Sequence, residues 1–309
     1  MTTLPKPAFD VDWHAQPADV IATVAAQAER LETPLSGGSA MVWHRWPKQP
    51  KDRPEDELPL VLVHGGWGAW THWIRNVPVL AARSTVIACD LPGLGDSDGI
   101  GRPETIKPVA EALAAGIESL LGKDARFDIA GFSFGGIASS HAAVIAGTRC
   151  RSFTAIGAAG FGDLHYIVGG IKVPDPRLSD AEIDAVHRSN LKILMLADDA
   201  AIDPLAVYVH RGNISRGRFR SRRISVSNGL VEALPDMQCA IGGIWGDQDI
   251  TGNGLAAIEQ RRDLFRQYRP DSPFDIIEGG GHWIMYEKPE AFEAALIGQL
   301  DTHARAETG

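Results

Sequence analysis

A single serine stands between glycines in the segment 131–135, whose sequence is GFSFG. An apolar run precedes it, and small residues compatible with a helix follow it. This pattern predicts a tight strand-to-helix turn that exposes the Ser133 hydroxyl at a sheet edge, beside the amide-rich start of a helix. A hydroxyl in that position can act as a nucleophile once a base removes its proton. The alternative is a loop in which Ser133 only caps the helix.

The matching base is predicted near the C-terminus. Of the ten histidines, His282 alone follows both a predicted strand and a cluster of glycines, which would let it reach across the sheet edge. An imidazole in this role needs a carboxylate to fix its tautomer. Asp249 is the preferred candidate because it lies past the turn made by Gly246, with Asp247 bracing that turn. Asp163, after the preceding predicted strand, stays open as a third candidate.

Attack on a carbonyl also requires donors for the oxyanion. The backbone N–H of Phe134 is one candidate, and the N–H of Gly66 in "VLVHGGWGAW" is the other. Aromatic residues surround these loops, and we predict that Trp67, Phe132 and Trp283 line a substrate pocket. The alternative for each of them is ordinary core packing.

The elements around these residues predict an α/β fold. A helix is expected over Pro17–Leu31, within an N-terminal helical extension, residues 1–38. Short apolar strands then alternate with helices through residues 39–160 and again through 238–309, as in a parallel sheet covered on both faces. Residues 161–237 interrupt the alternation with helical patterns alone. Because this segment is far longer than an ordinary connection, we predict a helical cap over the sheet's carboxyl edge.

Composition narrows the possible partners. The 309 residues are 44% hydrophobic and carry a net charge of −9, which argues against a nucleic-acid partner. No run of apolar residues is long enough for a membrane span, and no standard export signal begins the chain. The three cysteines lie far apart and suggest neither a disulfide frame nor a metal site. The expectation is a cytoplasmic protein without cofactor or metal, acting on a small-molecule ester, with a homodimer as the candidate assembly.

Taken together, the motifs resemble those of the α/β-hydrolase superfamily. They run from "HGG" through "DLPGLGDSD" and "GFSFGG" to "WGDQD" and "GHWIMYEKPEAF", and the order Ser133, Asp249, His282 matches. The resemblance implies a mostly parallel eight-stranded sheet with a cap between the sixth and seventh strands. Similar capped epoxide hydrolases and haloalkane dehalogenases use an aspartate where this chain has Ser133. The serine therefore favours carboxylic ester hydrolysis through an acyl-enzyme.

One branch of the superfamily, the meta-cleavage-product hydrolases, cleaves C–C bonds in dienoates with the same triad. "THWIRNVPVL" and "HWIMYEKPEAF" are similar to it, and C–C hydrolysis is the alternative function. The chain departs from that branch at "HGGWGAW", at Phe132 and in the cap, where Arg211 stands two residues before Asn213. Arg211 remains a candidate for binding a substrate carboxylate, or for pairing with acidic neighbours. A non-catalytic ligand-binding protein on this fold is the third, less favoured, expectation.

Overall fold

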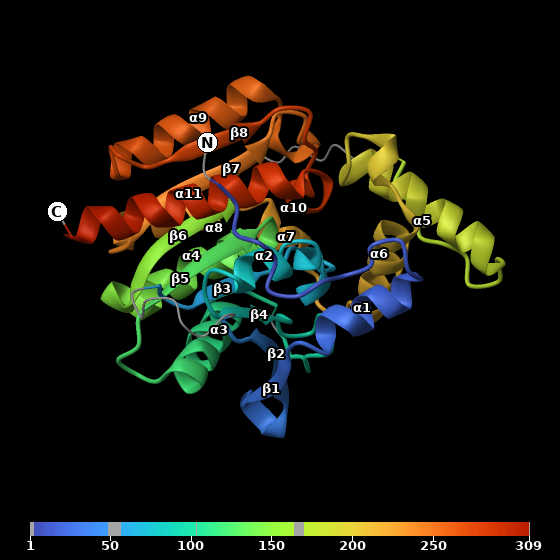
Figure 1. Cartoon of the computed structure of the whole chain (residues 1–309), viewed down its shortest axis with the longest axis horizontal. Coiled ribbons are helices and arrows are strands. Elements are labelled where there is room, and N and C mark those ends of the chain that lie inside the picture. The colour runs from blue at the N-terminus through green and yellow to red at the C-terminus, as the bar shows by residue number, and fades with distance from the viewer. Residues whose placement is uncertain (1–2, 49–56, 103, 164–169, 309) are drawn as a thin grey trace.

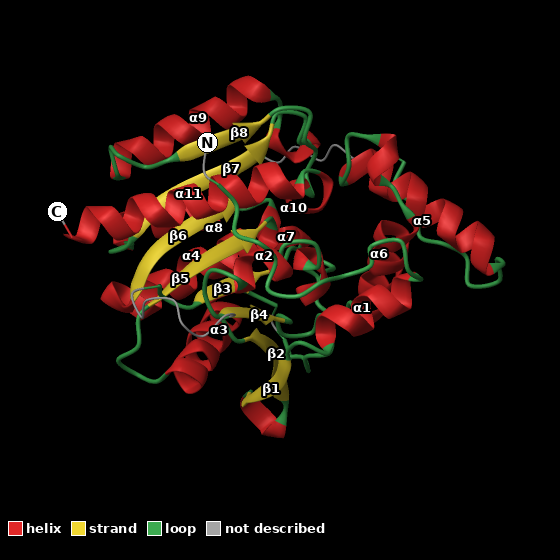
Figure 2. Cartoon of the chain, viewed as in Figure 1, coloured by secondary structure: helices red, strands yellow, loops and turns green. Residues whose placement is uncertain are grey.

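An eight-stranded sheet forms the centre of the computed structural model, which describes residues 3–48, 57–102, 104–163 and 170–308 (Figure 1, Figure 2). The strand order is β1-β2-β4-β3-β5-β6-β7-β8, and only the pairings β1–β2 and β2–β4 are antiparallel. The predicted mostly parallel sheet is therefore confirmed. The strands are β1 (Glu29–Pro34), β2 (Ala40–Trp46), β3 (Leu60–Val63), β4 (Val86–Cys89), β5 (Phe127–Phe132), β6 (Cys150–Ile156), β7 (Ala240–Gly246) and β8 (Phe274–Ile277).

Helices cover both faces of this sheet, because each strand presents apolar side chains alternately to either side. In β3, Val61 and Val63 join one buried cluster, whereas Leu60 and Leu62 join the other. Within the described residues, no helix is both long and apolar enough to cross a bilayer. The helices outside the β6–β7 connection are α1 (Pro17–Ala25), α2 (Val77–Ala81), α3 (Ile106–Leu121), α4 (Phe134–Ala146), α9 (Leu255–Tyr268), α10 (Ile284–Glu287) and α11 (Pro289–Thr308).

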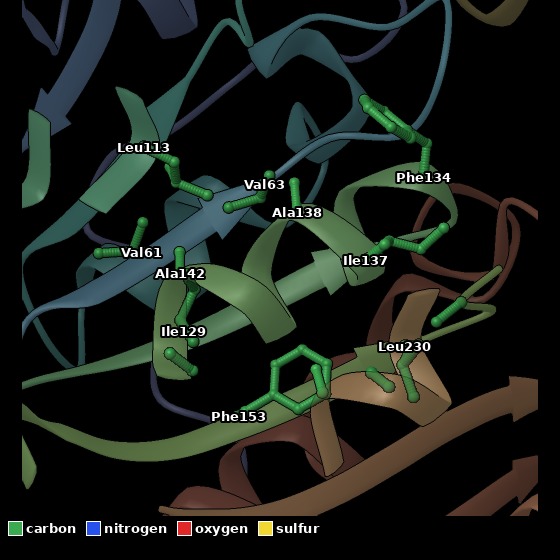
Figure 3. Close-up of a cluster of buried hydrophobic side chains, with 14 of the residues drawn as sticks. Val61, Val63, Leu113, Ile129, Phe134, Ile137, Ala138, Ala142, Phe153 and Leu230 are labelled. Carbon is green, nitrogen blue, oxygen red and sulfur yellow. The ribbon is translucent and has the colours of Figure 1, made fainter. Parts of the chain in front are cut away.

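Helix α4 holds the preceding turn, which carries Ser133, in place because the helix packs tightly against the strands that precede it in the chain. Figure 3 shows Ala138 of α4 beside Val63 of β3, and Ala142 of α4 beside Ile129 of β5, all in one buried cluster. Ten of the thirteen residues of α4 are buried, so its first turn cannot shift without disturbing the core.

The connection between β6 and β7 carries the remaining helices, α5 (Asp180–Leu194), α6 (Pro204–Arg216), α7 (Arg222–Ser225) and α8 (Gly229–Ala233). We call this connection the insertion; it corresponds to the predicted segment 161–237, of which 164–169 lie outside the described residues. Ser179 and Glu182 form a reciprocal capping box that starts α5. Figure 1 shows α5 and α6 beside α1, at the end of the sheet opposite the C-terminus.

The N-terminal extension differs from the prediction. Its helix ends at Ala25 rather than continuing to Leu31, and β1 forms within the segment expected to be helical. Strand β1 pairs with β2 over its whole length, and the indole N–H of Trp43 donates to Thr33 Oγ1 at 2.8 Å. Pairing with β2 thus overrides a local apolar spacing that also suits a helix.

Candidate active site

Ser133 sits at the predicted turn between β5 and α4. Its backbone has φ 52° and ψ −119°, a conformation that is rare for a residue with a side chain and is typical of strained functional turns. The turn also brings Gly135 against β3: a Cβ there would lie 2.3 Å from the His64 carbonyl oxygen. A glycine is therefore required at position 135. Ser133 itself is half-buried at the sheet edge.

The structure brings the three predicted residues together. His282 Nε2 lies 3.1 Å from Ser133 Oγ. On its other side, His282 Nδ1 lies 2.9 and 3.0 Å from the two carboxylate oxygens of Asp249. A carboxylate accepts only, so Nδ1 carries the proton and Nε2 is free to accept the proton of the serine hydroxyl.

Electrostatics keep Asp249 ionised inside the protein. Burial alone raises the pKa of this carboxyl, but attraction to His282 and hydrogen bonds from His282 and Thr251 outweigh it, so the pKa stays below its usual 3.8. The N–H and the hydroxyl of Thr251 both donate to Asp249 Oδ1 at 2.8 Å, and Thr251 Oγ1 lies 3.0 Å from His282 Nδ1. Sequence analysis missed Thr251, although a hydroxyl two residues after an aspartate is a common turn signal.

The two other aspartates that the sequence left open have different contacts. Asp247 accepts the Gly279 N–H at 2.8 Å, which braces the turns after β7 and β8. Asp163 forms an ion pair with Arg261 at 2.9 Å. Neither of them hydrogen-bonds to His282, so the geometry favours Asp249.

The candidate oxyanion donors, the amides of Phe134 and Gly66, flank Ser133 on α4 and on the loop after β3. In the described parts of the chain, neither amide donates to a protein acceptor, which leaves both N–H groups available to a ligand. His64 holds the loop: it accepts the Leu91 N–H at 2.8 Å, and its Nδ1 lies 2.7 Å from the Gly65 carbonyl. Burial lowers the pKa of His64 to about 4, so its ring is neutral.

Two of the predicted pocket residues are buried in the core, as the alternative of core packing expects. Phe132 and Trp283 are each 1% exposed. The Phe132 ring packs against His282 with centroids 4.8 Å apart, and the Trp283 indole donates to the His72 carbonyl at 2.9 Å and stacks on Tyr286. Phe132 therefore contacts the imidazole directly, whereas Trp283 anchors the position that follows His282.

The other two predicted pocket residues lie nearer the surface. Trp67 is 41% exposed on the loop after β3. Arg211 of α6 pairs with Asp180 at 2.6 Å and Asp184 at 2.9 Å, both on α5. It lines a groove of about 1390 Å³ between α1 and the helices α5 and α6, and Ser133 is not among the residues that form that groove. Arg211 thus follows the acidic-pairing alternative.

Comparisons with known proteins agree with this fold. The sequence profile of the alpha/beta hydrolase family matches residues 60–295. This chain belongs to that family. A solved esterase from Rhodococcus sp. ECU1013 superimposes with a TM-score of 0.66 at 19% identity, covering 88% of this chain and 98% of the esterase. That likeness concerns the fold.

Two relatives from Pseudomonas putida differ in their described activities. A dihydrolipoyllysine-residue acetyltransferase component of the acetoin cleaving system is 38% identical over 264 residues, which cover 81% of this chain and 65% of the relative. A 2-hydroxy-6-oxo-2,4-heptadienoate hydrolase is 39% identical over 108 residues, which cover 33% of this chain and 38% of the relative. The chain therefore spans less than two thirds of the length of either relative.

Proposed function

We propose that this chain is a serine hydrolase that cleaves carboxylic esters through an acyl-enzyme. The observation that carries the proposal is the continuous hydrogen-bonded series from Ser133 Oγ through His282 to Asp249, with distances of 3.1 and 2.9 Å. A nucleophile within reach of a base, and a base oriented by a third group, is the arrangement that activates a serine.

In the proposed reaction, His282 Nε2 takes the Ser133 proton as Oγ attacks the ester carbonyl carbon. The amides of Phe134 and Gly66 stabilise the resulting oxyanion, and Asp249 stabilises the imidazolium. The bond between the acyl carbon and the alkoxide oxygen then breaks as His282 Nε2 gives its proton to that oxygen, so that the alcohol leaves and the acyl group stays on Ser133 Oγ. A water molecule, deprotonated by the same imidazole, attacks the acyl carbon and releases the acid and free Ser133.

We further propose that the insertion acts as a cap over this site, as its contacts with the carboxyl edge of the sheet support. Phe219 of the insertion packs on Phe134 with ring centroids 5.6 Å apart. Thr71, just after the β3 loop, donates to Asn213 of α6 at 3.0 Å, and Arg216 pairs with Asp96 at 2.8 Å. Each contact joins the insertion to a segment that follows the carboxyl end of β3, β4 or β5, and α/β proteins bind their ligands at this edge.

Of the two candidate substrate classes, an ester without a free carboxylate fits the structure better than a dienoate does. C–C hydrolysis of a dienoate is the second candidate, favoured by the relative that acts as a 2-hydroxy-6-oxo-2,4-heptadienoate hydrolase. A dienoate carries a carboxylate that needs a cationic partner, and the Arg211 guanidinium is already paired with two aspartates. If Arg211 were that cationic partner, binding of the dienoate would have to break those pairs.

Replacing the nucleophile tests the proposal. Ser133→Ala should lower hydrolysis of p-nitrophenyl acetate and butyrate by about 10⁴-fold or more. Ser140→Ala on the same helix is the matched control, because the Ser140 hydroxyl only donates to the Ile137 carbonyl. Circular dichroism should show all three proteins equally folded.

Two further assays separate the alternative functions. A fluorophosphonate probe should label the wild type and not Ser133→Ala, and absence of labelling in the wild type would instead indicate a non-catalytic binding protein. Faster turnover of a 2-hydroxy-6-oxo-dienoate than of any ester in the panel would replace the ester assignment with C–C hydrolysis.

A further inference from the structure

Glu287 joins the loop that carries His282 to the insertion. It is the last residue of α10, and it is buried. Its two carboxylate oxygens accept different backbone amides: Oε2 accepts the N–H of Gly281 at 2.6 Å, and Oε1 accepts the N–H of Asp198 at 2.6 Å. Gly281 immediately precedes His282, whereas Asp198 lies in the connection between α5 and α6. We call this pair of hydrogen bonds the Glu287 bridge.

A second contact joins the same two segments. The N–H of Trp283 donates to the carbonyl of Met195, at the end of α5, at 2.7 Å. The residues on either side of His282 are thus both attached to the insertion: Gly281 through the Glu287 bridge to Asp198, and Trp283 directly to Met195. The approach is so close that a Cβ at Gly281 would lie 2.7 Å from the Ala197 nitrogen and 3.0 Å from the Met195 oxygen.

We infer that Glu287 is a positioning residue for His282, and that the position of the imidazole depends on the insertion through the Glu287 bridge. This inference rests on the proposed function of His282. The Ser133–His282 contact must be kept within a few tenths of an ångström, since a misplacement of about 1 Å can cost about 10²-fold in rate. Only a carboxylate has two acceptor oxygens at the right spacing. A glutamine would have to present its NH₂ group to one of the two amides.

Glu287→Gln tests the bridge directly. We expect kcat for p-nitrophenyl esters, normalised to the folded fraction from urea unfolding, to fall by about 10- to 100-fold. KM should change by less than about twofold, since Glu287 does not reach the predicted oxyanion amides. Loss of folded enzyme alone would not lower the normalised kcat, and an unchanged normalised kcat refutes the positioning role.

Asp198→Pro tests the connection to the insertion without altering Glu287. Proline removes the N–H that donates to Glu287, and the backbone of Asp198, with φ −93° and ψ 120°, lies near the range that proline adopts. The Asp198 side chain also caps Ala200, so Asp198→Ala is the matched control that loses the cap and keeps the N–H. Normalised kcat should fall at least about fivefold in the proline variant relative to the alanine variant. Equal values would refute the dependence on the insertion.

Amide hydrogen exchange gives a measurement that does not depend on activity. In Glu287→Gln, exchange at the amides of Gly281 and Asp198 should become faster, while exchange in the Ser133 segment stays as in the wild type. Unchanged exchange at both amides refutes the Glu287 bridge. Faster exchange in Glu287→Gln, combined with a wild type that hydrolyses no ester, would refute the proposed function and leave the bridge in place. If Glu287→Gln does not fold, the Asp198 pair of variants still decides the inference.

Discussion

Glu293 of α11 carries a buried carboxyl group. Replacing Glu293 by glutamine should remove a large part of the pH dependence of the protein's free energy of unfolding. The residue is 2% exposed, and its Oε1 accepts the Asn76 side-chain amide at 3.2 Å. Burial raises the pKa of Glu293 to about 8; repulsion from Glu290 adds to this effect, and the Asn76 hydrogen bond opposes it. Near neutral pH the folded protein therefore holds a protonated Glu293.

The sign of the effect follows from proton binding. An unfolded chain ionises Glu293 near its ordinary value of 4.5, so between 4.5 and about 8 the folded state binds one more proton. The stabilisation by the protonated Glu293 carboxyl is complete below the pKa that this group has in the unfolded chain. It is lost as the pH rises through the pKa that the group has in the folded protein. Each pH unit in that window lowers the free energy of unfolding by about 1.4 kcal/mol. Partial titration at both ends reduces the loss between about pH 5.5 and pH 7.5 to about 2 kcal/mol.

Urea unfolding followed by tryptophan fluorescence measures this loss. Relative to the wild type, Glu293→Gln should gain about 2 kcal/mol in free energy of unfolding on going from about pH 5.5 to pH 7.5. Glu290→Gln is the control: it removes an exposed neighbour and should keep most of the wild-type slope. If the curves of the wild type and Glu293→Gln run parallel across this range, Glu293 is ionised in the folded protein and the argument from burial is wrong.

Four further substitutions test the site. Asp249→Asn should lower kcat by about 10⁴-fold, whereas Asp247→Asn, at a turn, should retain activity within about threefold; paired ester assays measure both. Thr251→Val, which removes one hydrogen bond to Asp249, should lower kcat by about tenfold, and equal kcat would show that the amide of residue 251 suffices. Gly135→Ala should yield little soluble protein, because its methyl group would meet the His64 carbonyl; normal expression and activity would contradict this.

The residues that the sequence located well are those whose local context is unusual. A serine between glycines and a histidine after three glycines mark abrupt ends of strands, and parallel strands end at one edge of a sheet. Ser133 and His282 could therefore be expected at that edge, and in the structure His282 Nε2 lies 3.1 Å from Ser133 Oγ. The turn at Gly246 favoured Asp249 over Asp247. The parallel sheet could be predicted from the alternation of strands and helices, since each strand is short and continuously apolar.

Residues whose surroundings come from distant segments were not located well. Phe132 and Trp283 adjoin the candidate site in sequence, yet both side chains are buried in the core, where Phe132 packs against His282 and Trp283 stacks on Tyr286. Glu287 belongs to the same group: its partners are the amides of Gly281 and of Asp198, 89 positions away. In each case the residue type is common, and its role depends on contacts with segments that are distant in the sequence. These contacts form only when the insertion packs against the loop that carries His282, so the sequence alone does not reveal them.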